Sequence, residues 1–494
     1  MISMLKELKT FQQLEYICLL LFAFVIPMSW RIAIYVMIIL FVVAVLKGVF
    51  ENGFSINETQ YRNKVPYFIF IAFWFIYAIS FLYSDNTVEA RVQIGKKLSF
   101  LLFPMYFLCS NLSYLNKERI RVIMYSFVGG ILILFLINLV CAGYDILFNE
   151  AEIIRLTSPH KFFKTDDTIF PPMHRAHFSM YTCLGVVFCF MEFIKNNSLR
   201  LKIFDLLTSI FLFFSPFYIC SRAGVICSIV ILFTLWIWVT FMLKKKKFAI
   251  VTGSVLLISL VIGYFAFPQT IDRFTDAIDN LQNGKGDYRL TIRKANRHVL
   301  RENFVWGTGS GDRSEETLKS YYIYKDSLTA YMKLIKENDI NKNTIKGEID
   351  STIYEEKFVS EVYNYLDGVI KNKNNYNELL NKEYHNEYRM IQNCIKNNLN
   401  AHNQFTDTII AVGVIGLILL LSFFIYPIFL WIKNKNFDMV FFSLLLIIAF
   451  NSLFESVLER QMGIMFFVFF YFLLFHGNFC QQTNDNGQQT LSKI

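Results

Sequence analysis

The arginine at a tight turn between two apolar runs is the first residue whose position suggests chemistry. Arg222 follows Cys220 and Ser221 directly, and a lone guanidinium beside lipid is costly unless it reaches water or pairs with an anion. A planar guanidinium can bind two phosphate oxygens at once, which favours a phosphate-binding role at the membrane surface. The alternative is a side chain that snorkels to water and caps a helix end.

Three further arginines recur at four-residue intervals. On a helix, Arg289, Arg293 and Arg297 would stack along one face, where like charges repel each other unless an anion or carboxylates lie opposite. The spacing is compatible with a polyanion site beside the membrane and equally with a solvated basic face.

A glycine-rich turn follows these arginines, Gly307-Thr308-Gly309-Ser310-Gly311-Asp312. It lacks the Gly-Lys-Ser/Thr that completes a phosphate-binding loop, and no strand–helix context surrounds it. The sequence therefore predicts a turn that packs near a site and not a nucleotide-binding loop.

A histidine lies at the boundary between a polar loop and an apolar run. His402 belongs to Ala401-His402-Asn403-Gln404-Phe405, at the start of an expected helix. Imidazole titrates near physiological pH and can take a proton from an attacking hydroxyl, although an interfacial histidine can also be structural. One base and several arginines are together the equipment for displacing a phosphate leaving group from a lipid carrier.

The composition indicates a membrane protein. Of 494 residues, 54% are hydrophobic and only 18% are charged, whereas soluble proteins carry about a quarter charged residues. The net charge of +9 is divided among short clusters between apolar runs. We interpret these clusters as orientation signals and predict no nucleic-acid partner.

About twelve apolar runs are long enough to cross about 30 Å of hydrocarbon as helices. A helix satisfies all its backbone hydrogen bonds within one segment, so we predict an all-α polytopic membrane protein with about 12 transmembrane helices. The runs lie at 14–30, 32–49, 65–83, 94–110, 122–148, 173–194, 201–219, 223–243, 248–267, 405–432, 438–455 and 461–476.

Basic residues gather in alternate loops, which orients the chain. The positive-inside rule then places both termini in the cytoplasm and the long loop after the ninth run outside, together with Arg222, Arg289 and His402. The basic residues of the cytoplasmic loops are Lys6, Lys9, Lys47, Arg62, Lys64, Lys117, Arg119, Arg121, Lys195, Arg200, Lys202, Lys244, Lys245, Lys246, Lys247, Lys433 and Lys435.

This topology predicts four parts of the chain. Residues 1–267 form transmembrane helices 1–9, residues 268–400 an extracytoplasmic and mostly helical loop domain, residues 401–476 helices 10–12, and residues 477–494 a polar cytoplasmic tail. Apolar residues at helical spacing around Tyr354, Phe358, Val362 and Tyr365 predict two or three amphipathic helices within 313–400.

The cysteine and metal-ligand patterns of the sequence predict neither a disulfide framework nor a metal site. Cys394 is the one cysteine in the long loop, so no disulfide framework is predicted there. No CxxC, HExxH or other metal-ligand spacing occurs, and we predict neither a metal nor a cofactor.

Three motifs, in this order, resemble those of the O-antigen ligase and O-antigen polymerase superfamily of bacterial inner-membrane glycan enzymes. They are Ser221-Arg222-Ala223-Gly224 at the start of a span, Arg289-Leu290 followed by Gly307-x-Gly309-x-Gly311, and His402-Asn403-Gln404-Phe405 before Gly413-Val414-Ile415-Gly416. Arg293 stands where the family often has an aromatic residue, Phe304 replaces the usual proline, and 313–400 is an unusually long insertion.

The resemblance implies a fold similar to the C-type glycosyltransferases and a metal-independent, inverting transfer. The donor would be an undecaprenyl-diphosphate-linked glycan, and the acceptor a hydroxyl of lipid A core, protein or glycan. By the same resemblance His402 is the general base, and Arg222 and Arg289 hold the diphosphate. Apart from the resemblance, we predict that Arg293, Asn403, Ser221 and His177 contribute further contacts to the diphosphate or the glycan. The protein would then lie among the lipids of a bacterial inner membrane, with the large loop in the periplasm.

Other functions stay open at this point. A polysaccharide polymerase shares the donor chemistry and differs in its acceptor, and nothing in the sequence separates it from a ligase. A lipid-linked glycan flippase or secondary transporter would place ionisable residues near the bilayer midplane. The predicted spans are poor in charge, with Glu192 and Asp205 near their cytoplasmic ends. A structural scaffold is a third possibility.

Overall fold

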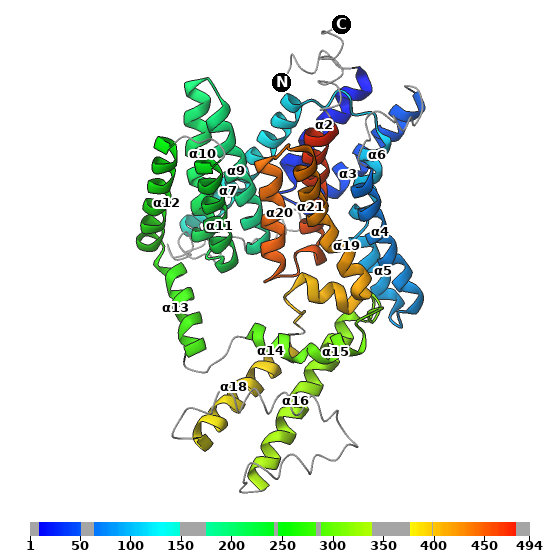
Figure 1. Cartoon of the computed structure of the whole chain (residues 1–494), viewed down its shortest axis with the longest axis vertical. Helices are drawn as coiled ribbons and strands as arrows, with labels where there is room; N and C mark the ends of the chain where they lie inside the picture. The colour runs from blue at the N-terminus through cyan, green and yellow to red at the C-terminus, as the bar shows by residue number, and fades with distance from the viewer. Residues whose placement is uncertain are drawn as a thin grey trace. The chain divides into compact units, whose positions relative to one another are not determined.

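The computed structural model describes residues 9–50, 64–148, 174–241, 246–282, 288–337, 376–397 and 399–480 of the chain (Figure 1). Every regular element within these ranges is a helix. The helices up to the long loop are α2 Thr10–Val25, α3 Trp30–Phe50, α4 Val65–Ser80, η1 Phe81–Tyr83, α5 Thr87–Lys96, α6 Ser99–Cys109, α7 Lys117–Phe148, α9 Arg175–Lys195, α10 Leu199–Tyr218, α11 Arg222–Phe241 and α12 Lys246–Ala266.

The second part of the chain is also helical, with one break inside a long helix. Its elements are α13 Pro268–Gln282, α14 Tyr288–Ala295, α15 Arg297–Glu302, α16 Arg313–Glu337, α18 Tyr376–Lys396, α19 Gln404–Asn434, α20 Met439–Ser452, η2 Val457–Glu459, α21 Gln461–Phe475 and the π-helical turn η3 His476–Cys480. Two long helices, α16 and α18, thus lie within 313–400, while the segment around Tyr354 to Tyr365 lies outside the described residues.

Each apolar run of the sequence except the one at 94–110 coincides with a helix. Within the described ranges, eight helices are long and apolar enough to cross a membrane, and α2 and α20 are shorter apolar helices. These findings confirm the predicted all-α polytopic membrane protein.

The run at 94–110 differs in detail from a single span. Helix α5 ends at Lys96 and the 11-residue helix α6 starts at Ser99; 11 residues of α-helix are only about 16 Å long. The interruption falls at Lys97, which is fully buried and forms an ion pair with Glu459, 2.9 Å from Nζ to Oε2. A buried ammonium needs such a partner, and reaching it fixes where the chain turns.

The described residues form two compact units, which are treated separately below. Unit 1 consists of Met1–Phe75, Gly95–Asp272 and Leu419–Ile494, and unit 2 of Ile76–Ile94 and Arg273–Ile418. Helices α4 and α19 contribute residues to both units.

The core of unit 1 is rich in phenylalanine. Helix α21 is almost entirely buried, and its Phe469 lies 4.7 Å from Phe22 between ring centroids. Elsewhere Phe70 stacks on Phe423 at 3.8 Å. Lipid tails are as apolar as these side chains, so close packing and ring contacts, not exclusion of water, hold such helices together.

Polar contacts in unit 1 join helix ends that the predicted topology places on the same side. At the predicted cytoplasmic side, Lys47 Nζ lies 2.5 Å from Glu15 Oε2 and donates to the Asn111 carbonyl at 2.8 Å. At the opposite side, Lys97 pairs with Glu459. The contacts agree with the alternating direction of the spans.

Unit 2 has a core of its own, built by α14, α16 and α18 (Figure 1). The buried residues of this core are Ile292, Ala295, Tyr321, Tyr324, Leu328, Ile391 and Cys394. They recur at helical spacing on three amphipathic helices, so each helix buries one stripe and leaves the opposite face to water.

The glycine-rich turn packs against a break in α19. Val412 and Gly413 leave the helical conformation, with φ of −136° and +69°. The amides of Thr308 and Gly309 donate to the carbonyls of Ile410 (2.7 Å) and Ala411 (3.1 Å), and Val414 N–H donates to the Phe304 carbonyl (2.8 Å). The turn thus satisfies backbone groups that the break would leave without partners, as apolar surroundings require.

We expect Gly413→Ala to destabilise the protein by about 2–4 kcal/mol. The backbone of Gly413 has φ +69° and ψ −168°, a region open essentially to glycine alone. An added Cβ would also lie 2.0 Å from the Val305 carbonyl oxygen. Thermal unfolding of the detergent-solubilised protein, followed by tryptophan fluorescence, measures the effect.

Gly95→Ala is the matched control, because Gly95 is helical and an added Cβ meets nothing within 4 Å. The thermal unfolding midpoint of Gly95→Ala should equal that of the wild type or exceed it, because alanine has a higher helix propensity than glycine. Equal losses of stability in Gly413→Ala and Gly95→Ala would contradict the inference that the backbone conformation at the break in α19 requires glycine.

Candidate functional site

The turn that carries Arg222 is locally specified by its neighbours. Cys220 adopts a left-handed conformation, with φ +49°, and Ser221 then caps α11 by accepting a hydrogen bond from Gly224 N–H at 3.2 Å. A Cβ at Gly224 would lie 2.3 Å from Ser179 Oγ, so glycine allows α11 to approach α9. Ser221 and Gly224 thereby fix Arg222 as the first residue of α11.

Arg222 itself is half-buried at the positive end of a helix. Within the described part of the chain, its guanidinium has neither a hydrogen-bond nor an ion-pair partner. A cation at a helix N-terminus is unfavourable for the helix dipole, whereas an anion bound there is stabilised by both charges. The position favours anion binding over a purely structural cap.

His177 lies in unit 1, near the first turn of α9, and is only 2% exposed. Its Nε2 atom lies 3.4 Å from the Val457 carbonyl oxygen, and its ring centroid lies 5.7 Å from that of His174. Through these contacts His177 packs against the segment between α20 and α21. Substrate contact by His177 stays a prediction.

His402 lies in unit 2, directly before α19. Asn403 is the helix cap, since its Oδ1 accepts from Thr406 N–H at 3.0 Å and its carbonyl accepts from Asp407 N–H at 3.0 Å. His402 has φ +48°, and its N–H donates to Asn400 Oδ1 at 3.1 Å. The side chain is half-buried.

Arg289 and Arg293 lie on α14, which the core of unit 2 holds in place. Ile292 and Ala295 of this helix are buried in the core, Arg289 is half-buried, and Arg293 is exposed. Arg293 has no hydrogen-bond or ion-pair partner among the described residues. Arg297 does not continue the same helix, because α14 ends at Ala295 and Arg297 begins α15.

A buried carboxylate anchors α14 through its neighbouring lysine. Glu387 of α18 lies 2.7 Å from Lys294 Nζ, accepts from the Thr291 hydroxyl at 2.8 Å, and is 4% exposed. Burial raises the pKa of Cys394, next to this cluster in the core, to about 12 and also raises the pKa of Tyr321. Both therefore stay neutral at physiological pH, and it is the contacts of Glu387 with Lys294 and Thr291 that hold α14 to α18.

The residues predicted to do chemistry share one local design. Arg222 and Arg289 lie in the first turn of a helix, and His402 lies two residues before another. Left-handed conformations, which cost of order 1–3 kcal/mol for residues other than glycine, occur in the described ranges at Cys220, His402 and Lys435. Of these three positions, His402 belongs to a predicted motif and Cys220 directly precedes another, and such strain typically concentrates at functional sites.

The predicted site residues divide between the two units. Unit 1 contains His177, Ser221 and Arg222, and the approach of Gly224 to Ser179 joins the α9 and α11 ends that carry them. Unit 2 contains Arg289, Arg293, His402 and Asn403. In the described ranges, no three His, Cys, Asp or Glu side chains are grouped so that they could hold a metal ion.

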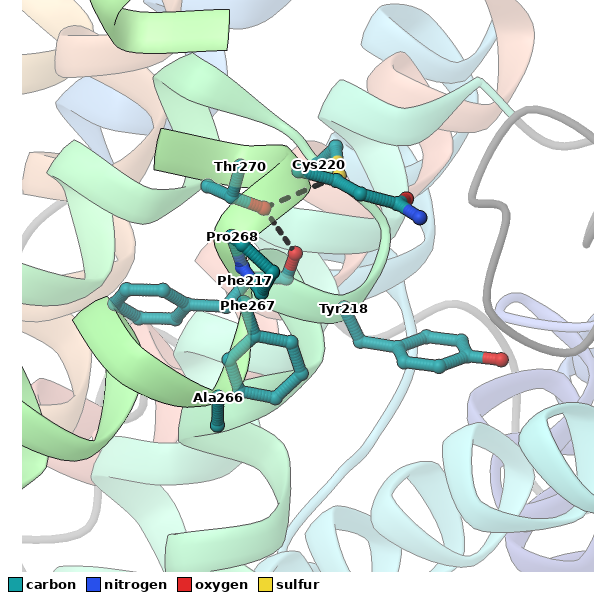
Figure 2. Close-up of a pocket in the computed structure, with 8 residues that line it drawn as sticks. Phe217, Tyr218, Cys220, Ala266, Phe267, Pro268 and Thr270 are labelled. Carbon is teal, nitrogen blue, oxygen red and sulfur yellow. Dashed lines mark hydrogen bonds between the residues drawn. The ribbon is translucent and has the colours of Figure 1, made fainter. Parts of the chain in front are cut away.

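An apolar pocket opens beside the Arg222 turn (Figure 2). It encloses about 300 Å³ between the end of α10 and the junction of α12 with α13. The Thr270 hydroxyl closes one side, 2.6 Å from the Phe217 carbonyl oxygen and 3.1 Å from Cys220 Sγ. The lining residues are Phe217, Tyr218, Cys220, Ala266, Phe267, Pro268, Gln269 and Thr270.

The sequence analysis named Asp312 only as part of the glycine-rich turn and did not single out Asp407, so the contacts of these two acidic residues were not predicted. Asp312 accepts from the N–H groups of Asp85 (2.8 Å) and Asn86 (2.7 Å), and so holds the glycine-rich turn against the start of α5. Asp407 pairs with Arg313 at 2.9 Å. The signal for Asp407 was an acidic residue at the start of an apolar helix, where a charge needs a partner.

Comparison with known proteins agrees with the motifs. Residues 207–333 match the family model described as O-antigen ligase. The matched range contains Arg222, Arg289 and the glycine-rich turn, and His402 follows it in the chain. Among curated proteins, none matches this chain. Over residues 207–333 the chain is therefore similar to the O-antigen ligase family, and the order of the motifs agrees with this similarity.

Proposed function

We propose that the protein transfers a glycan from an undecaprenyl-diphosphate carrier to an acceptor hydroxyl at the periplasmic side of a bacterial inner membrane. The observation that carries the proposal is the placement of Arg222 and Arg289 in first helical turns and of His402 just before one. Helix N-termini and guanidinium groups both favour an anion such as a diphosphate.

The proposed reaction is a single displacement at the sugar. His402 removes the proton from the acceptor hydroxyl, and the resulting oxygen nucleophile attacks C1 of the donor sugar. The bond between C1 and the phosphate oxygen breaks, and its electron pair leaves with the undecaprenyl diphosphate. Arg222 and Arg289 stabilise the negative charge that develops on this leaving group, and the configuration at C1 inverts.

Purified protein in lipid nanodiscs tests the proposal directly. It is incubated in the presence of a chelator with a fluorescent undecaprenyl-diphosphate glycan and, separately, with lipid A core or with a second lipid-linked glycan. Transfer to lipid A core identifies a ligase, and lengthening of the lipid-linked glycan identifies a polymerase. No transfer to either acceptor or to a protein hydroxyl would overturn the function.

The pocket beside Arg222 is suited to the prenyl chain of the donor. Its aromatic lining, Phe217, Tyr218 and Phe267, is apolar, and Cys220 at its edge is two residues before Arg222. A diphosphate held by Arg222 would therefore have its first isoprene units within reach of the pocket. Burial of apolar surface would add to donor affinity at about 25 cal/mol per Å².

We expect Ala266→Trp to raise the donor KM about tenfold, because the indole would fill part of the pocket and exclude the prenyl chain from it. A tenfold change corresponds to a loss of about 1.4 kcal/mol of donor binding free energy. A donor analogue with a methyl group in place of the prenyl chain, which cannot reach the pocket, should show a smaller change. Val261→Trp is the control, because Val261 is an exposed residue of the same helix. Equal KM values for wild type and Ala266→Trp with the long-chain donor would exclude the pocket.

A further inference from the structure

A buried ion pair holds the start of α19 next to His402. Arg313 Nη1 lies 2.9 Å from Asp407 Oδ1, and the two side chains are 9% and 1% exposed. Arg313 is the first residue of α16 and Asp407 lies in the first turn of α19, five residues after His402. The pair therefore connects α16 to the helix whose N-terminus carries the proposed base.

Helix α16 also holds the chain on the other side of His402. The Tyr321 hydroxyl donates to the carbonyl of Leu399 at 3.0 Å and lies 3.3 Å from that of Asn400. Ala401 packs in a small cluster with Val299 and Ile410. His402 is thus flanked by attached residues on both sides, and α16 supplies an attachment before it and another after it.

Because α16 holds the chain both before and after His402, this residue can keep an unfavourable backbone conformation. A left-handed histidine, φ +48°, persists only where the surrounding structure determines it. The capping bonds of Asn403 and the Asn400 side chain act locally, whereas Arg313 and Tyr321 tie the segment to a long helix. The segment is therefore held in one orientation relative to α14, which packs on α16 in the same core.

A buried ion pair contributes less to net stability than its contact suggests, because both charges lose their hydration. Apolar residues of similar volume often give equal or greater stability, whereas a charge pair accepts only one geometry. The position of this pair beside the base favours a role in geometry over a role in stability.

We propose that Arg313 and Asp407 are positioning residues that orient His402 for removal of the acceptor proton. This inference rests on the proposed transferase function. Displacement of a base by about 1 Å can reduce turnover about a hundredfold without loss of substrate binding. The pair should therefore affect kcat strongly and the KM for the donor little.

The main test variant removes both charges, Arg313→Met with Asp407→Leu, so that neither partner is left buried and alone. Asp407→Asn keeps the shape of one side chain and removes its charge. Lys319→Met is the matched control, because Lys319 lies on the same helix and pairs with Glu315 and Glu316 at the surface. Exposed pairs of this kind contribute little.

Two measurements are made on each folded variant in nanodiscs: kcat and donor KM for glycan transfer, and hydrogen–deuterium exchange of the backbone amides of residues 399–407. For the double variant we expect kcat to fall about 10- to 100-fold, donor KM to stay within about threefold, and exchange at 399–407 to accelerate. The core amides of residues 292–295 should exchange as in the wild type. Lys319→Met should match the wild type in every measurement.

A folded double variant with wild-type kcat, or one with unchanged exchange at 399–407, would overturn the inference. A uniform acceleration of exchange through unit 2 would also overturn it, because the pair would then stabilise the unit as a whole. If wild type and Lys319→Met both fail to transfer glycan, the proposed function fails, while the exchange data still show whether the pair orders the segment.

Discussion

His402→Ala should reduce glycan transfer by about 10²- to 10⁴-fold, the usual contribution of a general base. Without the imidazole, the acceptor hydroxyl must lose its proton to water as it attacks C1. His402 precedes the capped end of α19, so alanine leaves the cap intact and the protein should insert and fold normally. Initial rates in nanodiscs with excess donor and acceptor measure the loss.

His385→Ala is the matched control for this substitution. His385 is exposed on α18 within the same unit and has no place in the proposed reaction. Its rate should equal that of the wild type. Full activity of a well-expressed His402→Ala protein would rule out the general-base role and leave the anion-binding residues as the only supported part of the mechanism.

Arg222→Ala should reduce transfer by about 10²- to 10³-fold, comparable with the loss of one preorganised donor to a developing negative charge. Arg222→Lys should restore only part of this loss, because an ammonium is a point charge and cannot replace two parallel N–H bonds to a phosphate. Since the cap is formed by Ser221, neither substitution should unfold α11. Single-turnover rates with bound donor separate the chemical step from binding.

Arg200→Ala provides the comparison for Arg222. Arg200 is exposed near the start of α10, at the side that the charge pattern assigns to the cytoplasm. Its removal should leave the transfer rate unchanged. Equal rates for Arg222→Lys and the wild type would show that charge alone suffices and would contradict bidentate binding.

The fold was largely predictable because membrane helices are specified by local composition. A run such as 461–476 must be helical wherever it crosses lipid, since no other backbone partner is available, and α21 coincides with it. The run at 94–110 was harder, because its interruption depends on Glu459, far along the chain, where a partner for Lys97 is found. Sequence periodicity carries no information on such pairs.

The helix starts that carry the candidate site residues were also predictable from the sequence, whereas the contacts between distant segments that hold those helices in place were not. Ser221 and His402-Asn403 are recognisable as helix starts, and the structure has helices there. The anchoring of α14 by Glu387 depends on a helix that lies almost a hundred residues later. The bend that separates Arg297 from Arg293 falls at Asn296, whose Oδ1 accepts from Ser320 on α16. These contacts join distant segments, so only the folded unit reveals them.

The glycine-rich turn is attached to α19 through backbone hydrogen bonds, in which the side chains of residues 304–306 take no part. Backbone amides and carbonyls make the connection, so it is indifferent to the side chains carried by residues 304–306. Those side chains, Phe304, Val305 and Trp306, are 48%, 52% and 68% exposed. The side chains of residues 304–306 can therefore change while Gly307, Gly309 and Gly413 stay fixed, so the surface of the turn can vary without loss of its attachment to α19.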